Sequence, residues 1–221
     1  VAAVRDEGRR ALLAGVLDRF DSHVAPALPR LRHSVIHNDA NDWNVLVDDA
    51  GRAVSGLIDV GDAVFAPTVA DLAVAAAYAM LGAGDPVVAA EAIVRGFHEA
   101  LPLTSVEQTL LPDLIAARLA ISVSISAKRQ ATSDDPYLFV SEAPAWELLR
   151  WLSSADAARL PSAIARACGT TALPPRQPTA DVAAARAARL GRNVTLSYGT
   201  PLHIVRGDDV WLVAADGRRY L

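Results

Sequence analysis

The stretch from Ile36 to Asp62 constrains the fold of this chain more than any other segment, because two short apolar runs alternate there with polar turns. Val45–Val47 and Val54–Ile58 have the aliphatic, β-branched composition of strands. The residues between them, Asp48–Arg52, form a turn cluster that contains a glycine. The sequence therefore predicts that the two runs pair as a β-hairpin.

Three oxygen-bearing side chains are expected at the open end of this hairpin. Asn44 precedes the first strand and Asp59 follows the second, so closing the hairpin brings them together. Asp39 lies five positions before Asn44 in the same polar loop. Hard oxygen ligands suit Mg²⁺, which proteins hold with one or two side chains while substrate phosphates complete the shell. A further carboxylate can accept the proton of a hydroxyl nucleophile, and this division of labour is typical of phosphoryl transfer.

The same residues match a known signature. His37, Asp39 and Asn44 fit the pattern H-x-D-x-x-x-x-N, and Ile58-Asp59 fits the I-D motif that follows it. In these residues the chain resembles the aminoglycoside phosphotransferase/choline kinase family of small-molecule kinases, which is similar to the protein kinases in its C-terminal lobe. The resemblance implies that Asp39 is the catalytic base, that Asn44 and Asp59 bind Mg²⁺ and the nucleotide, and that ATP is the co-substrate.

The resemblance also assigns supporting roles. It implies that His37 braces the loop and that Asp71, in a Pro-x-x-x-Asp-Leu-Ala segment, does the same from the following helix. Asn38 departs from the family, which often has glycine at this position; a side chain there would narrow the loop without removing a ligand. Asp42 and Asp62 are interpreted as turn or capping residues.

Composition narrows the function classes. The net charge of −4 gives no basic field for nucleic acid and no polybasic membrane patch. We find no apolar run near the ~18 residues of a membrane-spanning helix. The single cysteine, Cys168, fits a reducing compartment, so we expect no nucleic-acid partner, no membrane and a cytoplasmic location.

The rest of the chain to residue 169 is predicted to be mainly helical. The N-terminal helix is expected from Ala2 to about Ser22, and a turn is expected over Ala66–Thr68, with Thr68 capping the next helix. Thr104 with Glu107 or Gln108 is expected to form a capping box. Later helices are expected over residues 69–81, 87–101 (with Val88 facing inward), 110–129, 141–152 and 156–168. The predicted fold class is α+β and mainly helical: a protein-kinase-like C-lobe over residues 1–169, with a small catalytic hairpin.

The chain changes character after residue 169. Residues 170–181 are predicted to be a proline-rich linker, and residues 182–221 a short helix followed by a β-meander. Pro201-Leu202, Arg206-Gly207 and the segment Asp216–Leu221 resemble the N-terminal opening of class III pyridoxal-phosphate aminotransferases. The alternative is a loosely packed terminal extension.

Some parts of a complete small-molecule kinase are expected to lie elsewhere. Such a kinase needs a phosphate-covering loop and a strand lysine. No Gly-rich loop precedes Asp39, and the only lysine, Lys128, is expected on a helix. We therefore expect a segment of a longer polypeptide, inactive alone, whose partners are a small-molecule hydroxyl acceptor, an N-lobe and a downstream domain that binds pyridoxal phosphate.

Three alternatives stay open at this point. One is a degenerate kinase-like module that binds without catalysis, although such copies tend to lose one of Asp39, Asn44 and Asp59. A second is an aminoglycoside-type phosphotransferase unrelated to pyridoxal chemistry. The third is a non-haem iron site formed by His37-x-Asp39 with His98 or His203, which the long helical stretch argues against because such triads favour β-barrels.

Overall fold

The computed structural model describes residues 3–51, 53–130, 142–169, 179–189, 202–208, 211–214 and 219–220. The chain divides into two compact units, Val1–Ala172 and Leu173–Leu221. The division falls inside the segment expected to be a linker, of which residues 170–178 lie outside the described residues.

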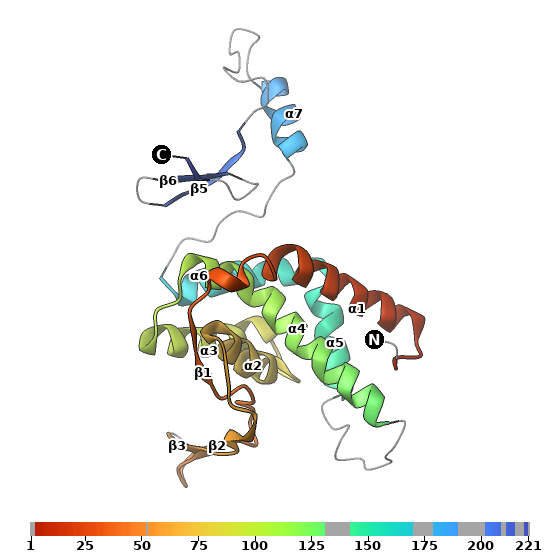
Figure 1. Ribbon diagram of the computed structural model, residues 1–221, viewed down its shortest axis with the longest axis vertical. Coiled ribbons are helices and arrows are strands. Elements are labelled where there is room, and N and C mark those ends of the chain that lie inside the picture. Colours follow the sequence, from red (N-terminus) through yellow and green to blue (C-terminus); the bar gives the residue numbers. More distant parts are fainter. Residues whose placement is uncertain are drawn as a thin grey trace. The chain divides into compact units, whose positions relative to one another are not determined.

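The first unit is mainly helical, as predicted, and is organised around one long helix. That helix, α4, packs against four others from both sides of it in the sequence (Figure 1). The helices of the unit are α1 (Glu7–Arg19), α2 (Thr68–Met80), α3 (Pro86–Ala100), α4 (Ser105–Arg129), α5 (Glu142–Leu152) and α6 (Arg159–Ala167). Their shared core includes the fully buried side chains of Leu13, Leu72, Leu111, Ile115, Trp146, Leu149 and Ile164.

Polar caps fix where these helices begin. Asp6 accepts a hydrogen bond from the Arg9 main chain (2.7 Å), so α1 starts later than the expected Ala2. Its last turn passes into a π-helical turn over Phe20–Val24. Thr104 and Glu107 form the predicted capping box at the start of α4, which satisfies main-chain N–H groups that a helix end leaves unpaired.

α4 corrects one expectation from the sequence. Its 25 residues are long and apolar enough to cross a membrane, whereas no run of that kind was expected. Half of its most apolar window is buried inside this unit, where the helix packs on α1, α2, α5 and α6. Length and composition alone are weak evidence for a span, and the same features suit the central helix of a packed helical core.

Two small antiparallel sheets complete the unit. The predicted hairpin is present as β2 (Val45–Val47) and β3 (Val54–Leu57), with Val45 opposite Leu57. A second pair, β1 (His33–Ile36) and β4 (Val64–Pro67), was not expected. Figure 1 shows β2 and β3 at one end of the unit, beyond the helices.

The pairing of β1 with β4 overturns the predicted turn at Ala66–Thr68. Pro67 ends an edge strand, where its missing N–H leaves no ladder bond unmade, and the chain enters α2 at Thr68 without a turn. Thr68 is therefore the first helical residue and not the cap; its hydroxyl bonds that of Ser34 at 2.9 Å. Val88 is likewise exposed and not inward, and Val87 takes the buried position at the start of α3.

The second unit contains α7 (Thr179–Arg189) and a three-stranded antiparallel sheet in the order β5-β6-β7. The strands are Ile204–Asp208, Trp211–Ala214 and Arg219–Tyr220. The predicted meander is thus present in the described residues of this unit, with Ala214 buried.

Candidate active site

The loop that follows β1 has a constrained main chain. Asn38 has a positive φ of 66°, a conformation that glycine adopts most easily and that asparagine tolerates better than most residues. Its main-chain N–H donates to Asp71 Oδ1 of α2 at 2.8 Å, so the bracing contact expected for Asp71 is present. The Asn38 side chain donates to the Asp62 carbonyl at 3.3 Å and thereby ties the loop to the chain after β3.

His37 is a buried brace, as expected. Its Nδ1 accepts the main-chain N–H of Asp39 at 3.3 Å, so Nε2 carries the proton and donates to the Ile58 carbonyl at 2.9 Å. Both ring nitrogens are engaged, which leaves none to ligate iron. His98, one of the two candidates for the third ligand beside His203, accepts the N–H of Leu103 on another part of the unit. This geometry contradicts the non-haem iron alternative.

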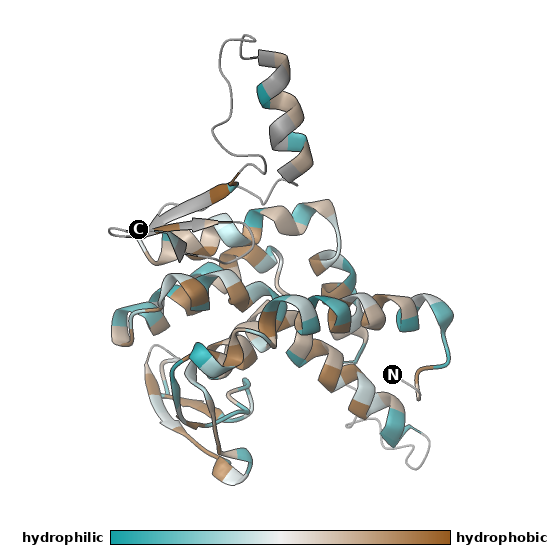
Figure 2. Cartoon of the chain, turned by 45° about the horizontal axis from the view of Figure 1, so that its top comes forward, coloured by the Kyte–Doolittle hydropathy of each residue, from teal (hydrophilic) through white to brown (hydrophobic). Residues whose placement is uncertain are grey.

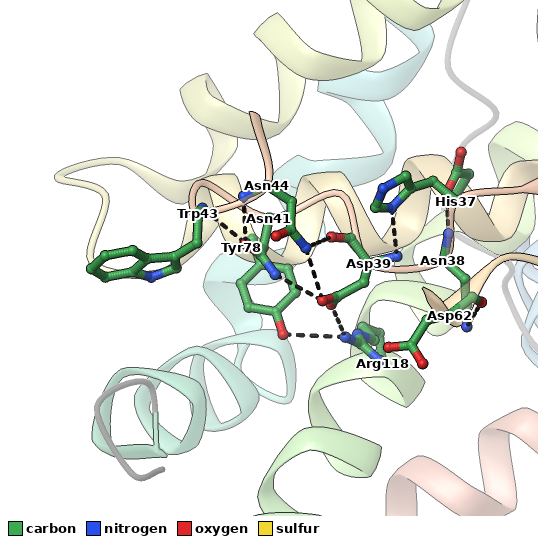
Figure 3. Close-up of polar contacts among 10 residues, drawn as sticks. His37, Asn38, Asp39, Asn41, Trp43, Asn44, Asp62, Tyr78 and Arg118 are labelled. Atoms are coloured by element: carbon green, nitrogen blue, oxygen red, sulfur yellow. Dashed lines mark hydrogen bonds and ion pairs between the residues drawn. The ribbon is translucent and has the colours of Figure 1, made fainter. Parts of the chain in front are cut away.

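Asp39 is the centre of the polar contacts in this loop (Figure 3). One carboxylate oxygen, Oδ2, accepts hydrogen bonds from Asn41 Nδ2 at 3.0 Å and from Asn44 Nδ2 at 3.1 Å. The other, Oδ1, accepts one from Arg118 Nη2 at 2.9 Å, which is also an ion pair. The carboxylate is partly buried and is held from both sides.

Arg118 and Tyr78 are site residues that the sequence did not indicate. Arg118 lies on α4, 79 positions from Asp39, and Tyr78 lies on α2. Nη2 of Arg118 also donates to the Tyr78 hydroxyl at 3.1 Å, and the guanidinium carbon lies 5.5 Å from the centre of the Tyr78 ring. No spacing rule links residues so distant, so only packing of α4 on α2 reveals the contact.

Asn44 and Asp59 lie at the mouth of the hairpin. The Ile58 N–H donates to the Asn44 carbonyl at 2.9 Å, which places the two main chains side by side. Asn44 is buried, and its Nδ2 also donates to the Asp39 carbonyl at 2.9 Å, so its side-chain oxygen is left for another partner. Asp59 has a positive φ of 60°, and its exposed carboxylate has no hydrogen-bond or ion-pair partner among the described residues.

These two oxygen donors fit a magnesium ion. A carboxylate and an amide oxygen are hard donors, which Mg²⁺ prefers, and phosphate oxygens and water would complete its octahedral shell. The described residues contain no group of three or more His, Cys, Asp or Glu that could hold a metal on their own. A site of this kind would therefore depend on oxygens brought by a substrate.

A cleft adjoins the loop on the side of α2 and α3. It has a volume of about 370 Å³, and apart from one carboxylate its lining is apolar or small: Ala40, Asp71, Leu72, Ile93, Gly96 and Phe97. A second cleft, of about 320 Å³, is lined by residues of α1, α4 and α6 and by none of the loop residues. Of these two clefts, only the first borders the loop, through Ala40.

Part of the chain matches a known family model. The family model described as the phosphotransferase enzyme family matches residues 2–108, a range that includes Asp39, Asn44 and Asp59 but ends before Arg118. No solved structure matches the chain.

Curated relatives share one description. Hydroxylysine kinase of Mus musculus is 28% identical over 161 residues, covering 69% of this chain and 43% of the relative. Hydroxylysine kinase of Xenopus laevis is 26% identical over 160 residues (68% and 43%), and that of Danio rerio 26% over 163 residues (66% and 46%). The chain thus spans less than half the length of these relatives.

Proposed function

We propose that the first unit is the metal- and acceptor-binding lobe of an ATP-dependent kinase that phosphorylates a hydroxyl group of a small molecule. The observation that carries this proposal is the carboxylate of Asp39, which accepts hydrogen bonds from the loop amides of Asn41 and Asn44 and from Arg118. Similarity to the phosphotransferase family and to hydroxylysine kinases supports the same reaction class. The acceptor is proposed to be an amino alcohol or a hydroxy-amino acid.

The proposed reaction assigns one task to each residue. Asp39 orients the acceptor hydroxyl and takes its proton as the hydroxyl oxygen bonds to the γ-phosphorus of ATP. The bond from that phosphorus to the bridging oxygen breaks, and ADP leaves. Asn44 and Asp59 would hold Mg²⁺, which neutralises charge on the phosphates. His37 and Asp71 keep the loop in place.

Two matched substitutions in the natural full-length protein test this assignment. Asp39→Asn is expected to lower kcat for phosphate transfer by about 10²–10⁴-fold, because the base is lost, with unchanged affinity for Mg-ATP. Asp59→Asn is expected to weaken Mg-ATP binding as well, because it removes a charged metal ligand. ADP release and calorimetric titration of Mg-ATP measure the two effects.

Asp62→Asn is the control, since Asp62 is an exposed acidic residue three positions after Asp59 whose carbonyl, not its carboxylate, contacts the loop. It should leave both quantities unchanged. Equal and modest losses in all three variants would contradict the separate roles of base and metal ligand. A degenerate binding module would instead show no ADP release in the wild type with any acceptor.

We also propose that the second unit begins a class III pyridoxal-phosphate domain that acts on the phosphorylated product. The antiparallel meander β5-β6-β7 supports this proposal, since it occurs where the Arg-Gly and Asp-Gly motifs suggest a hairpin. Phosphorylation converts a hydroxyl into a good leaving group, and pyridoxal phosphate supplies an electron sink at the neighbouring amine.

The test is to incubate the natural full-length protein with ATP, pyridoxal phosphate and a panel of amino alcohols, hydroxy-amino acids and aminoglycosides. ADP, free phosphate and carbonyl product are followed together. All three are expected to form with an amine-bearing acceptor. ADP formation with aminoglycosides alone, and no carbonyl product with any acceptor, would leave an aminoglycoside-type phosphotransferase as the correct description.

A further inference from the structure

The two oxygens of Asp39 are held by different parts of the chain. Asn41 and Asn44, both within the loop, donate to Oδ2, whereas Arg118 of α4 donates to Oδ1. A carboxylate offers about two lone pairs on each oxygen. Within the described residues, Oδ2 therefore has both of its acceptor positions occupied, and Oδ1 has one.

Arg118 is itself fixed in position. Both hydrogens of its Nη2 are used, one on Asp39 and one on the Tyr78 hydroxyl, and the guanidinium lies over the Tyr78 ring. Its Nε is buried and has no hydrogen-bond partner in the described structure. Burying an unpaired donor costs roughly 1–3 kcal/mol, so the orientation seen here is held by the two Nη2 contacts against that cost.

We propose that Arg118 is a positioning residue that presents Oδ1 of Asp39 as the oxygen that receives the acceptor's proton. This inference rests on the proposed kinase function and names a residue that the matched family segment, which ends at residue 108, does not contain. When the hydroxyl proton moves to Oδ1, the carboxylate loses its charge and the fixed positive charge of Arg118, 2.9 Å from that oxygen, is no longer neutralised by it. Such a preplaced charge favours the transition state more than the bound substrate.

The first variant to test is Arg118→Met in the natural full-length protein. It is expected to lower kcat by about 100-fold, the effect of a misplaced catalytic group, with little change in the KM of ATP or acceptor. Arg118→Lys, which keeps the charge but not the planar fork, should recover part of the loss. Tyr78→Phe should lower kcat only several-fold, because the Asp39 contact remains.

Arg19→Met is the matched control. Arg19 also bridges α4 to another element, through a 3.1 Å ion pair with Asp113, but it touches none of the loop residues. Like Arg118→Met it removes an ion pair to α4, and it should leave kcat unchanged. Adding guanidinium ion to Arg118→Ala should restore some activity, whereas it should not rescue Asp39→Asn.

The failure of the positioning role and the failure of the kinase function give different results. A folded Arg118→Met enzyme with wild-type kcat, or with a loss confined to KM, would overturn the positioning role while the kinase function stands. A wild-type protein that phosphorylates no hydroxyl acceptor would overturn the proposed function itself. If Arg118→Met fails to fold, Arg118→Lys decides: a reduced kcat at unchanged melting temperature supports the role, and an unchanged kcat refutes it.

Discussion

The helices of the first unit bury most of their large apolar side chains, whereas the strands beside the candidate active site expose most of theirs. Apolar residues occur along both regions (Figure 2). Trp146 and Ile115 in the helices are 1% and 0% exposed, but Val35 and Phe65 on the β1–β4 pair are 75% and 67% exposed. The strands and their loop therefore gain little from hydrophobic burial within this unit.

Polar contacts replace burial in the loop region. His37 reaches the Ile58 carbonyl, Asp71 holds the Asn38 main chain, and Arg118 holds Asp39. These contacts specify direction and distance, which burial does not. We infer that burial in the helices provides most of the stability of the unit, whereas a few hydrogen bonds set the geometry of the site. Substitutions in the two regions should therefore affect different measurements.

A core tryptophan and a strand valine give the strongest test of this contrast. Trp146→Ala should lower the free energy of unfolding by about 3–5 kcal/mol, because it leaves a cavity in the core. Val35→Ala, at a side chain that is 75% exposed, should change it by no more than about 0.5 kcal/mol. Urea denaturation followed by circular dichroism measures both. Equal losses would show that the loop region is stabilised by burial after all.

Asp71 should give a smaller and mixed effect. Asp71→Ala leaves the Asn38 N–H without its 2.8 Å acceptor, which should cost about 1–3 kcal/mol and lower kcat as the loop loosens. Asp71→Asn keeps an oxygen at the same place and serves as the control. If the alanine variant loses stability but keeps full activity, the contact is a stabilising one and does not set the geometry of the site.

Glu107 extends the comparison to a polar contact inside the helical body. Burial by itself would raise the pKa of Glu107, but hydrogen bonds from Arg32 and Thr104 outweigh it and hold the pKa below its ordinary 4.5. Because the folded pKa is lowered, the contribution to stability is complete above the unfolded pKa and is lost as the pH falls through the folded value.

The expected result is a difference between wild type and Glu107→Gln that is constant from pH 7 to about 5 and shrinks below that. At pH 7 the difference should be about 1–2 kcal/mol, since Arg32 donates to both carboxylate oxygens of a fully buried group. Unfolding free energies across this range measure it. Activity per folded molecule should not change. A fall in kcat would contradict the view that the helical body sets stability and the loop alone sets the geometry of the site.

Local patterns were enough to predict the helices and the hairpin, and the family resemblance predicted the bracing contacts. The capping box at Thr104, the hairpin of β2 and β3, and the contact of Asp71 with the loop all depend on residues near in sequence or on a recognisable motif. The roles of Asp39, Asn44 and Asp59 stay predictions, although the loop does bring Asn44 onto Asp39.

Contacts between distant segments that no motif marks could not be predicted. The β1–β4 pair joins residues 28 to 34 positions apart, and Ala66-Pro67 has the composition of a turn, so local propensity pointed the wrong way. Arg118 lies in a run of apolar helical residues with no motif around it. Its role depends on which face of α4 meets α2, and that is decided by packing of the whole core.

Lys128 near the end of α4 has a practical consequence for labelling. It is the only lysine in these 221 residues, and it is exposed on the same helix as Arg118, about 15 Å further along the axis. Among these residues it is therefore the one side chain that an amine-reactive dye or surface linker can modify, at a fixed offset from the arginine that holds Asp39. Emission from such a dye could report on movement of α4 without any change to the reacting groups.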